Sequence, residues 1–143
     1  MASAGGYFIE DLTGGHAETF AKTVTDADIV LYSGVSGDTN PVHLDDEYAA
    51  ATPFKGRIAH GLLTASFISA VLGARMPGPG AIYVSQTLKF KAPVRPGDTV
   101  TAKCEVTAID RAKRRVTLST TCLVKDKPVV EGEAVVMPPS REG

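Results

Sequence analysis

The stretch Gly61–Arg75, with the sequence GLLTASFISAVLGAR, decides the fold of this chain. Apolar or small side chains occupy nearly all of its positions, and a helix that lacks a polar face is a buried one. The residues Met76–Gly80 (MPGPG) end the helix, because proline and glycine do not continue it. The sequence therefore predicts one central helix that other elements cover on nearly every side.

The residues after Ala81 follow a period of two. Apolar side chains alternate with polar ones in two clear runs, and a third run ends the ordered chain; the runs are Val100–Ala108, Val116–Val124 and Val129–Met137. Side chains alternate across a strand, so these strands bury one face and expose the other. We predict about four antiparallel strands in a meander after the helix.

A sheet that covers one helix on nearly every side must curve strongly. A strongly curved antiparallel sheet around a central helix is the hot-dog architecture, an α+β fold. The 143 residues fit one such domain, which we assign to residues 1–143. The sheet leaves an edge strand that pairing between two chains would protect, so we expect a homodimer.

The residues before the central helix have a mixed pattern. A short strand is expected around Glu18–Thr23. A helix begins at Thr25, which can cap the first turn in a capping-box-like pair with Asp28, and the residues Ser33–Gly37 stop it. A short acidic helix follows around Asp45–Ala51, and turn-rich sequence joins these elements.

The net charge of −1 hides an asymmetry along the chain. Residues 1–60 hold nine acidic and three basic side chains, whereas residues 89–115 hold eight basic and three acidic ones. Taken alone, the basic stretch fits solvated strand edges and turns; its alternative role is a surface for a phosphorylated ligand. Without a net positive charge or a long apolar run, binding to nucleic acid and insertion into a membrane are both disfavoured.

The two cysteines, Cys104 and Cys122, lie in strand-like segments and lack the spacing of a metal site. Buried free thiols are typical of a reducing cytosol, and residues 1–6 lack the pattern of a secretory signal, so we expect a cytoplasmic protein. The three histidines share no ligand spacing, so no metal site is expected.

The most informative segment for chemistry is Ser36–Asp45, SGDTNPVHLD. It places the carboxylate of Asp38 five residues before the imidazole of His43, and the Asn40-Pro41 pair between them turns the backbone. Two such groups around one water molecule can act as acid and base. Each residue also has a structural alternative: Asp38 as a turn former, His43 as a structural histidine, and Asn40 as the residue that holds the loop shape.

A second candidate site is the start of the central helix, where Gly61 follows His60. A helix N-terminus presents unpaired N–H groups, and glycine lets a ligand oxygen that gains negative charge approach them closely. The alternative for Gly61 is a tightly packed entry turn, and we interpret His60 as a neighbour that shapes the loop. Farther along, the Ser69 hydroxyl needs a partner, which is Asp38, the reacting water or a backbone carbonyl one turn back.

Three segments together resemble the MaoC-like dehydratases. They are the motif Asp38-x-Asn40-Pro41-x-His43 with the following Asp45, the tetrapeptide Ala59–Leu62 and the stretch Phe90–Asp98 (FKAPVRPGD). The resemblance extends from about Thr25 to Val136. It is closest to the short, single-domain (R)-specific enoyl-CoA hydratases, the group that feeds polyhydroxyalkanoate synthesis.

The resemblance implies a homodimeric hot-dog enzyme that hydrates trans-2-enoyl-CoA to (R)-3-hydroxyacyl-CoA, reversibly and with no cofactor beyond the coenzyme A of its substrate. It assigns the catalytic water to Asp38 and His43, the oxyanion contact to Gly61, and a supporting contact with the aspartate to Ser69. If one water supplies both the hydroxyl group and the proton, addition is syn.

The coenzyme A end of such a substrate carries phosphates. Lys89, Lys91 and Arg95 are the candidates to meet them, and the turn Arg111–Arg115 is another. Lys89 and Lys91 are two residues apart and therefore share one face of a strand. His60 is grouped with them as a candidate substrate contact. The alternative is that these lysines only solvate their face of the sheet.

Other reactions would use the same residues. A dehydratase for 3-hydroxyacyl groups on acyl carrier protein, or for a short branched hydroxyacyl-CoA, is the first alternative. A hot-dog thioesterase is disfavoured, because thioesterases of that fold usually carry a carboxylate on the central helix and Gly61–Arg75 has none. A non-catalytic acyl-CoA-binding module, or the inactive half of a heterodimer, would be expected to lack the Asp38–His43 pair.

Overall fold

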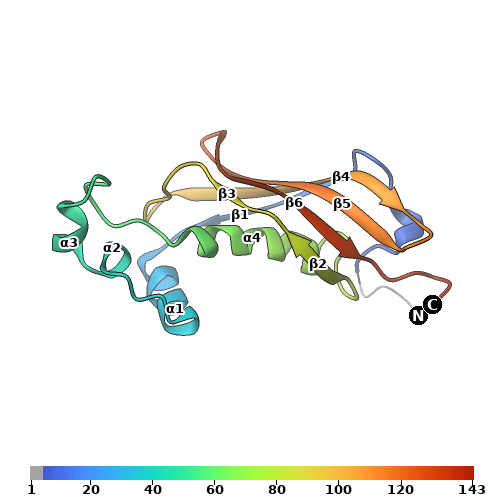
Figure 1. Cartoon of the computed structure of the whole chain (residues 1–143), viewed down its shortest axis with the longest axis horizontal. Coiled ribbons are helices and arrows are strands. Elements are labelled where there is room, and N and C mark those ends of the chain that lie inside the picture. The colour runs from blue at the N-terminus through green and yellow to red at the C-terminus, as the bar shows by residue number, and fades with distance from the viewer. Residues whose placement is uncertain (1–4) are drawn as a thin grey trace.

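A curved antiparallel sheet over one long helix forms the body of the protein (Figure 1). The computed structural model describes residues 5–143, and the central helix is α4 (Gly61–Ala74). The α+β hot-dog architecture predicted from the sequence is confirmed. Residues 1–4, on which part of the argument against a secretory signal rests, lie outside the described residues.

The sheet has six strands, more than the sequence predicted. They are β1 (Ala17–Thr23), β2 (Ile82–Gln86), β3 (Lys89–Phe90), β4 (Thr99–Asp110), β5 (Arg115–Val124) and β6 (Lys127–Met137). Their order is β1-β4-β5-β6-β2, with β3 also on β6, so the predicted meander is right only for β4 to β6. The pairing of β1 with β4 joins strands far apart in the chain, which local alternation does not reveal.

The sheet covers only one side of α4, so the prediction of a helix buried all round is wrong for a single chain. Five large side chains face the sheet and are buried: Leu63, Phe67, Ile68, Val71 and Leu72. Leu62, Ser66, Ser69 and Gly73 form an exposed stripe at spacings of three and four residues, which lies on one side of a helix. We call these four residues the open stripe of α4.

Three shorter helices precede α4. Helix α1 (Asp26–Ser36) has the predicted capping box of Thr25 and Asp28, and it ends at Gly37, whose φ is 82°. It therefore runs through most of the segment Ser33–Gly37 that was predicted to stop it. Helix α3 (Asp46–Ala50) is the predicted acidic helix.

Helix α2 (Pro41–Leu44) was not predicted. Asn40 caps it by accepting a hydrogen bond from the N–H of Val42, and Pro41 occupies its first turn. Proline is tolerated there because the first N–H groups of a helix have no intrahelical acceptor. The Asn-Pro pair does turn the chain as expected, but it turns it into a new short helix.

Helices α1, α2 and α3 lie together beyond the N-terminal end of α4 (Figure 1). Arg57 joins two of them, because its guanidinium lies 2.9 Å from Asp26 at the start of α1 and 2.5 Å from Asp46 at the start of α3. This ion-pair network holds the segment between α1 and α3 in one arrangement. Within residues 5–143, no helix is both long and apolar enough to cross a membrane.

Both cysteine thiols are fully buried under the sheet. Burial raises the pKa of Cys104 and that of Cys122 to about 12, because a thiolate is poorly solvated there. The thiolate is the reactive form, so we expect the folded protein to resist a thiol-specific disulfide reagent at about pH 8. The chain unfolded in denaturant should titrate both thiols, and rapid reaction of the folded protein would contradict this burial.

Candidate active site

The loop between α1 and α2 holds Asp38 in a fixed turn. The Asp38 carboxylate accepts a hydrogen bond of 3.2 Å from the N–H of Asn40, and Asn40 in turn caps α2. The structural alternatives for Asp38 and Asn40 are therefore both realised. The turn uses only Oδ1 of Asp38, and the residue also lines a cavity. The turn role therefore leaves the Asp38 carboxylate available for a second contact.

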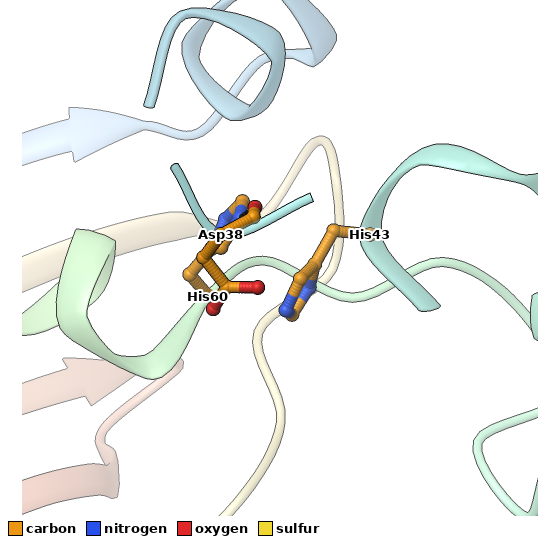
Figure 2. A group of neighbouring side chains, drawn as sticks. All are labelled: Asp38, His43 and His60. Atoms are coloured by element: carbon orange, nitrogen blue, oxygen red, sulfur yellow. Dashed lines mark hydrogen bonds between the residues drawn. The ribbon is translucent and has the colours of Figure 1, made fainter. Parts of the chain in front are cut away.

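His43 projects from α2 toward Asp38. Its side chain is buried, and Nδ1 lies 2.8 Å from the carbonyl oxygen of Ile58. A carbonyl can only accept, so Nδ1 carries the hydrogen and Nε2 of the neutral ring presents a lone pair. Figure 2 shows the Asp38 carboxylate and the His43 ring pointing toward one another. The fold thus brings together the two groups that the sequence singled out.

His60 connects this pair to the central helix. Its Nε2 lies 2.9 Å from the backbone carbonyl of Asp38 and 3.1 Å from the hydroxyl of Ser33. Its ring stacks on that of His43 with centroids 3.8 Å apart, and the ring of Tyr32 lies on it at 4.8 Å. His60 therefore shapes the loop, as predicted, and also fixes the backbone of one member of the pair and the ring of the other.

Asp38, His43 and His60 bring one ligand atom each within 4.8 Å of one another, as a metal site would. The sequence argument against a metal rested on spacing, and the fold removes that argument by joining His43 to His60. The planes of the His43 and His60 rings, however, are only 25° apart. The nitrogen lone pairs of these two stacked rings therefore lie in nearly parallel planes and do not point at one common position. An ion needs lone pairs that converge. This geometry favours a water over a metal, and the absence of a metal stays a prediction.

A cavity of about 620 Å³ opens at the N-terminal end of α4. Asp38, His43, His60 and Gly61 line it together with apolar side chains. Gly61 is the first residue of α4, so its N–H has no acceptor within the helix. The cavity thus combines a carboxylate and an imidazole with a backbone N–H that has no acceptor within the helix.

The exposed ring of Phe90 covers Gly61. A methyl group on Gly61 would lie 2.6 Å from two ring carbons of Phe90. Gly61 is therefore the tightly packed entry to the helix that the structural alternative described, and it also lines the cavity. Its contact with a ligand oxygen stays a prediction. Phe90 is a lining residue that the sequence reasoning missed, because nothing in its local pattern places it against the start of α4.

Ser69 is exposed on the open stripe of α4 and does not line the cavity in the described chain. Eight residues of helix separate it from Gly61, a rise of about 12 Å. The described contacts of Asp38 do not include Ser69. The supporting role of Ser69 stays a prediction.

The basic candidates for phosphate binding separate into three groups. Lys91 is exposed and lines the cavity, whereas Lys89 is exposed on β3 outside it. The Arg95 guanidinium donates to the backbone carbonyl of Phe54, so it clamps the loop after α3. Arg111 lies in the turn between β4 and β5, at the end of the sheet away from α2 (Figure 1). Its guanidinium donates to the backbone carbonyls of Ile9 and Leu12.

The family of this fold and site follows from comparison with known proteins. The sequence model of the MaoC-like domain family matches residues 10–127 of this chain. The chain belongs to the MaoC-like domain family. As a member it carries the motif Asp38-x-Asn40-Pro41-x-His43 inside the matched range, which agrees with the resemblance noted in the sequence.

Individual members of the MaoC-like family cover nearly the whole chain. The chain is 58% identical to the (R)-specific enoyl-CoA hydratase of Rhodospirillum rubrum, over 94% of each protein. It is 51% identical to the 3-hydroxybutyryl-CoA dehydratase of Methylorubrum extorquens, over 94% of this chain and 86% of that one. The unliganded (R)-hydratase structure from Pseudomonas aeruginosa superposes with a TM-score of 0.91 at 42% identity, over 95% of this chain and 88% of that one.

The contact between Gly61 and Phe90 generates a stability prediction. Gly61→Ala places a methyl group against the ring, and we expect it to lower the free energy of unfolding by about 1 kcal/mol or more, as overpacking does. Gly34→Ala in α1 is the control, because its methyl group meets nothing within 4 Å, it lies outside the open stripe, and alanine favours a helix.

Urea unfolding of both variants measures this difference. Adding Phe90→Ala to Gly61→Ala should recover most of the loss by removing the ring. Equal stabilities for Gly61→Ala and Gly34→Ala would show that Phe90 does not press on the first turn of α4.

Proposed function

We propose that this chain catalyses the reversible hydration of trans-2-enoyl-CoA to (R)-3-hydroxyacyl-CoA. The observation that carries the proposal is the Asp38 carboxylate facing the His43 ring in a cavity that also contains the start of α4. The names of the relatives support the same reaction, because one is an (R)-specific enoyl-CoA hydratase and dehydration, named in the other, is the reverse of hydration.

The two groups are suited to orienting one water. Nε2 of neutral His43 and the Asp38 carboxylate are both hydrogen-bond acceptors. A water between them donates one hydrogen to each, which leaves an oxygen lone pair to face C3 of the enoyl group. The stacked ring of His60 keeps His43 from rotating away from this position.

The reaction then needs two proton transfers, one from the water to the Asp38–His43 pair and one from the pair to the substrate. The water oxygen bonds to C3, the electron pair of the C2–C3 double bond moves toward the thioester carbonyl, and one water proton passes to the Asp38–His43 pair. The pair returns that proton to C2, and the carbonyl is restored. Because one water supplies both groups from one side, the addition is syn.

The negative charge of the enolate forms on the thioester oxygen. The N–H of Gly61 donates to that oxygen, and the dipole of α4 adds to the stabilisation. No step requires a cofactor beyond the coenzyme A of the substrate. Lys91, exposed on the lining of the cavity, is the basic side chain best placed for the phosphates of coenzyme A. A single domain over residues 1–143 and a cytoplasmic location also stay predictions.

A homodimer would cover two uncovered features of the chain. The open stripe of α4 exposes Leu62, and the edge strand β2 exposes Ile82, Tyr83 and Val84. An exposed edge strand with apolar side chains favours pairing with another chain. We therefore propose that a second copy packs against β2 and the open stripe.

The hydratase proposal is tested with crotonyl-CoA and longer 2-enoyl-CoA substrates. The parent should remove the ultraviolet absorbance of the conjugated thioester, and chiral analysis should identify an (R)-product. Asp38→Asn and His43→Gln should each lower kcat by about 100- to 10,000-fold, the loss typical of a general acid or base. Asp45→Asn is the matched control in the same motif, because the Asp45 side chain caps α3 and does not line the cavity.

Three results would contradict this assignment. Equal activity in Asp38→Asn would leave the reaction standing and remove the role given to Asp38. Turnover only on acyl carrier protein thioesters would favour the carrier-protein dehydratase. Binding of acyl-CoA without turnover would favour the non-catalytic module.

The proposed dimer is tested by light scattering after size-exclusion chromatography. The parent should elute with twice the mass of one chain, and Val84→Lys on β2 should shift it toward the monomer by placing a charge at the edge. Thr19→Lys on β1, the opposite edge of the sheet, is the control and should stay dimeric. A parent that is monomeric at every concentration would contradict the dimer.

A further inference from the structure

The loop between α3 and α4 carries part of the cavity wall on a weakly supported backbone. Phe54 lies in this loop, lines the cavity and is 37% exposed. Among the described residues, the backbone of positions 53–57 makes one hydrogen bond to another backbone group, from the Lys55 N–H to the Thr52 carbonyl in the same loop. The position of Phe54 therefore depends on contacts from side chains.

Arg95 supplies such a contact from a distant part of the chain. One terminal nitrogen of its guanidinium donates to the backbone carbonyl of Phe54. The other lies 3.4 Å from the place that a methyl group on Gly56 would take. Both terminal nitrogens thus face the loop. This orientation suits a clamp on the loop better than the phosphate contact that the sequence suggested for Arg95.

The turn that carries Arg95 is itself firmly joined to the core. The Arg95 N–H donates to the Asp98 carboxylate at 2.9 Å, and the Asp98 N–H donates back to the Arg95 carbonyl at 3.0 Å. Val24, which is fully buried, exchanges backbone hydrogen bonds with the same turn, at 2.8 Å with Asp98 and 2.7 Å with Gly97. Arg95 therefore connects a fixed turn to a loop that has little support of its own.

The place of Phe54 indicates which part of a substrate it meets. A residue that lines the cavity and is also partly exposed lies where the cavity opens to solvent. In the proposed reaction the thioester lies at Gly61, and the phosphates of coenzyme A reach solvent near Lys91. The pantetheine arm joins these two ends and must pass through the opening. Its methylene groups suit contact with an aromatic ring.

We propose that Phe54 packs against the pantetheine arm of the substrate, and that Arg95 is the positioning residue that holds Phe54 in place. We call this pair the Arg95–Phe54 latch. Arg95 acts here through Phe54 and not through a phosphate. The latch itself rests on the contacts of the loop, and its role toward the arm rests on the proposed function.

The latch is tested first without reference to activity, by limited digestion of the folded protein with trypsin. Lys55 is an exposed cleavage site in the loop, and local opening governs cleavage of a folded chain. Mass spectrometry should show cleavage after Lys55 several times faster in Arg95→Gln than in the parent. Arg75→Gln is the matched control, because Arg75 is also exposed and donates to a backbone carbonyl, that of Thr19, outside the cavity. Equal cleavage of parent and Arg95→Gln would overturn the latch.

The role of the latch is tested by steady-state kinetics on crotonyl-CoA. Phe54→Ala and Arg95→Gln should each raise KM by about tenfold, the effect of losing one partly buried apolar contact. The value of kcat should change little, because a contact to the arm is the same in the ground state and the transition state. Arg75→Gln should keep the parent KM. A parent KM in Phe54→Ala would overturn the contact with the arm.

Crotonyl-pantetheine separates the latch from a phosphate contact, because it keeps the arm and lacks the nucleotide and its phosphates. The latch predicts the same relative rise in KM for Arg95→Gln on both substrates. A rise on crotonyl-CoA alone would overturn the proposal in favour of a phosphate contact.

A double variant tests whether Arg95 acts through Phe54. Phe54→Ala combined with Arg95→Gln should have a KM no higher than that of Phe54→Ala, because the clamp has no ring left to hold. Effects that multiply would overturn the positioning role. A parent inactive on every enoyl thioester would remove the hydratase proposal and the role toward the arm together, while the digestion with trypsin still decides the latch.

Discussion

A hydrogen bond of 2.9 Å between His60 Nε2 and the carbonyl of Asp38 joins the two halves of the site. One half is the loop after α1, and the other is the first turn of the buried helix. The sheet holds α4 through Leu63, Phe67 and Ile68, and His60 at the start of this helix is itself buried. The hydrogen bond from His60 therefore fixes the loop after α1 relative to α4. It keeps Asp38 at the same cavity as Gly61, although the Asp38 side chain is exposed.

The same histidine explains how an exposed segment can hold Asp38 and His43 in a fixed arrangement. Helices α1 to α3 bury little of their own surface, and α1 exposes Leu31 and Val35. Their arrangement depends on the stack of His43 against His60, on backbone hydrogen bonds and, to a smaller extent, on the ion pairs of Arg57 with Asp26 and Asp46. Surface ion pairs stabilise a fold only weakly, so the stack and the backbone hydrogen bonds carry most of the positioning.

The first turn of α4 combines structural and chemical roles. Its backbone presents the free N–H of Gly61, and its side chains present two buried polar atoms that the rest of the described chain does not satisfy. A folded domain tolerates such atoms where a ligand or an ordered water completes them. The open stripe farther along the same helix has the opposite character, because its exposed small residues suit close packing against another surface.

The sequence by itself determined the central helix and the alternating strands, because both follow a local periodicity of apolar side chains. It also determined the segment that carries Asp38 and His43, because these residues form a short local motif. Only the tertiary structure decided that β1 pairs with β4, that one side of α4 stays open, and that Ser69 lies on this open side and outside the cavity. The same holds for the stack of His60 on His43 and for the unpaired hydroxyl of Thr64. These features depend on contacts between residues distant in the chain or on solvent exclusion, and neither leaves a local pattern in the sequence.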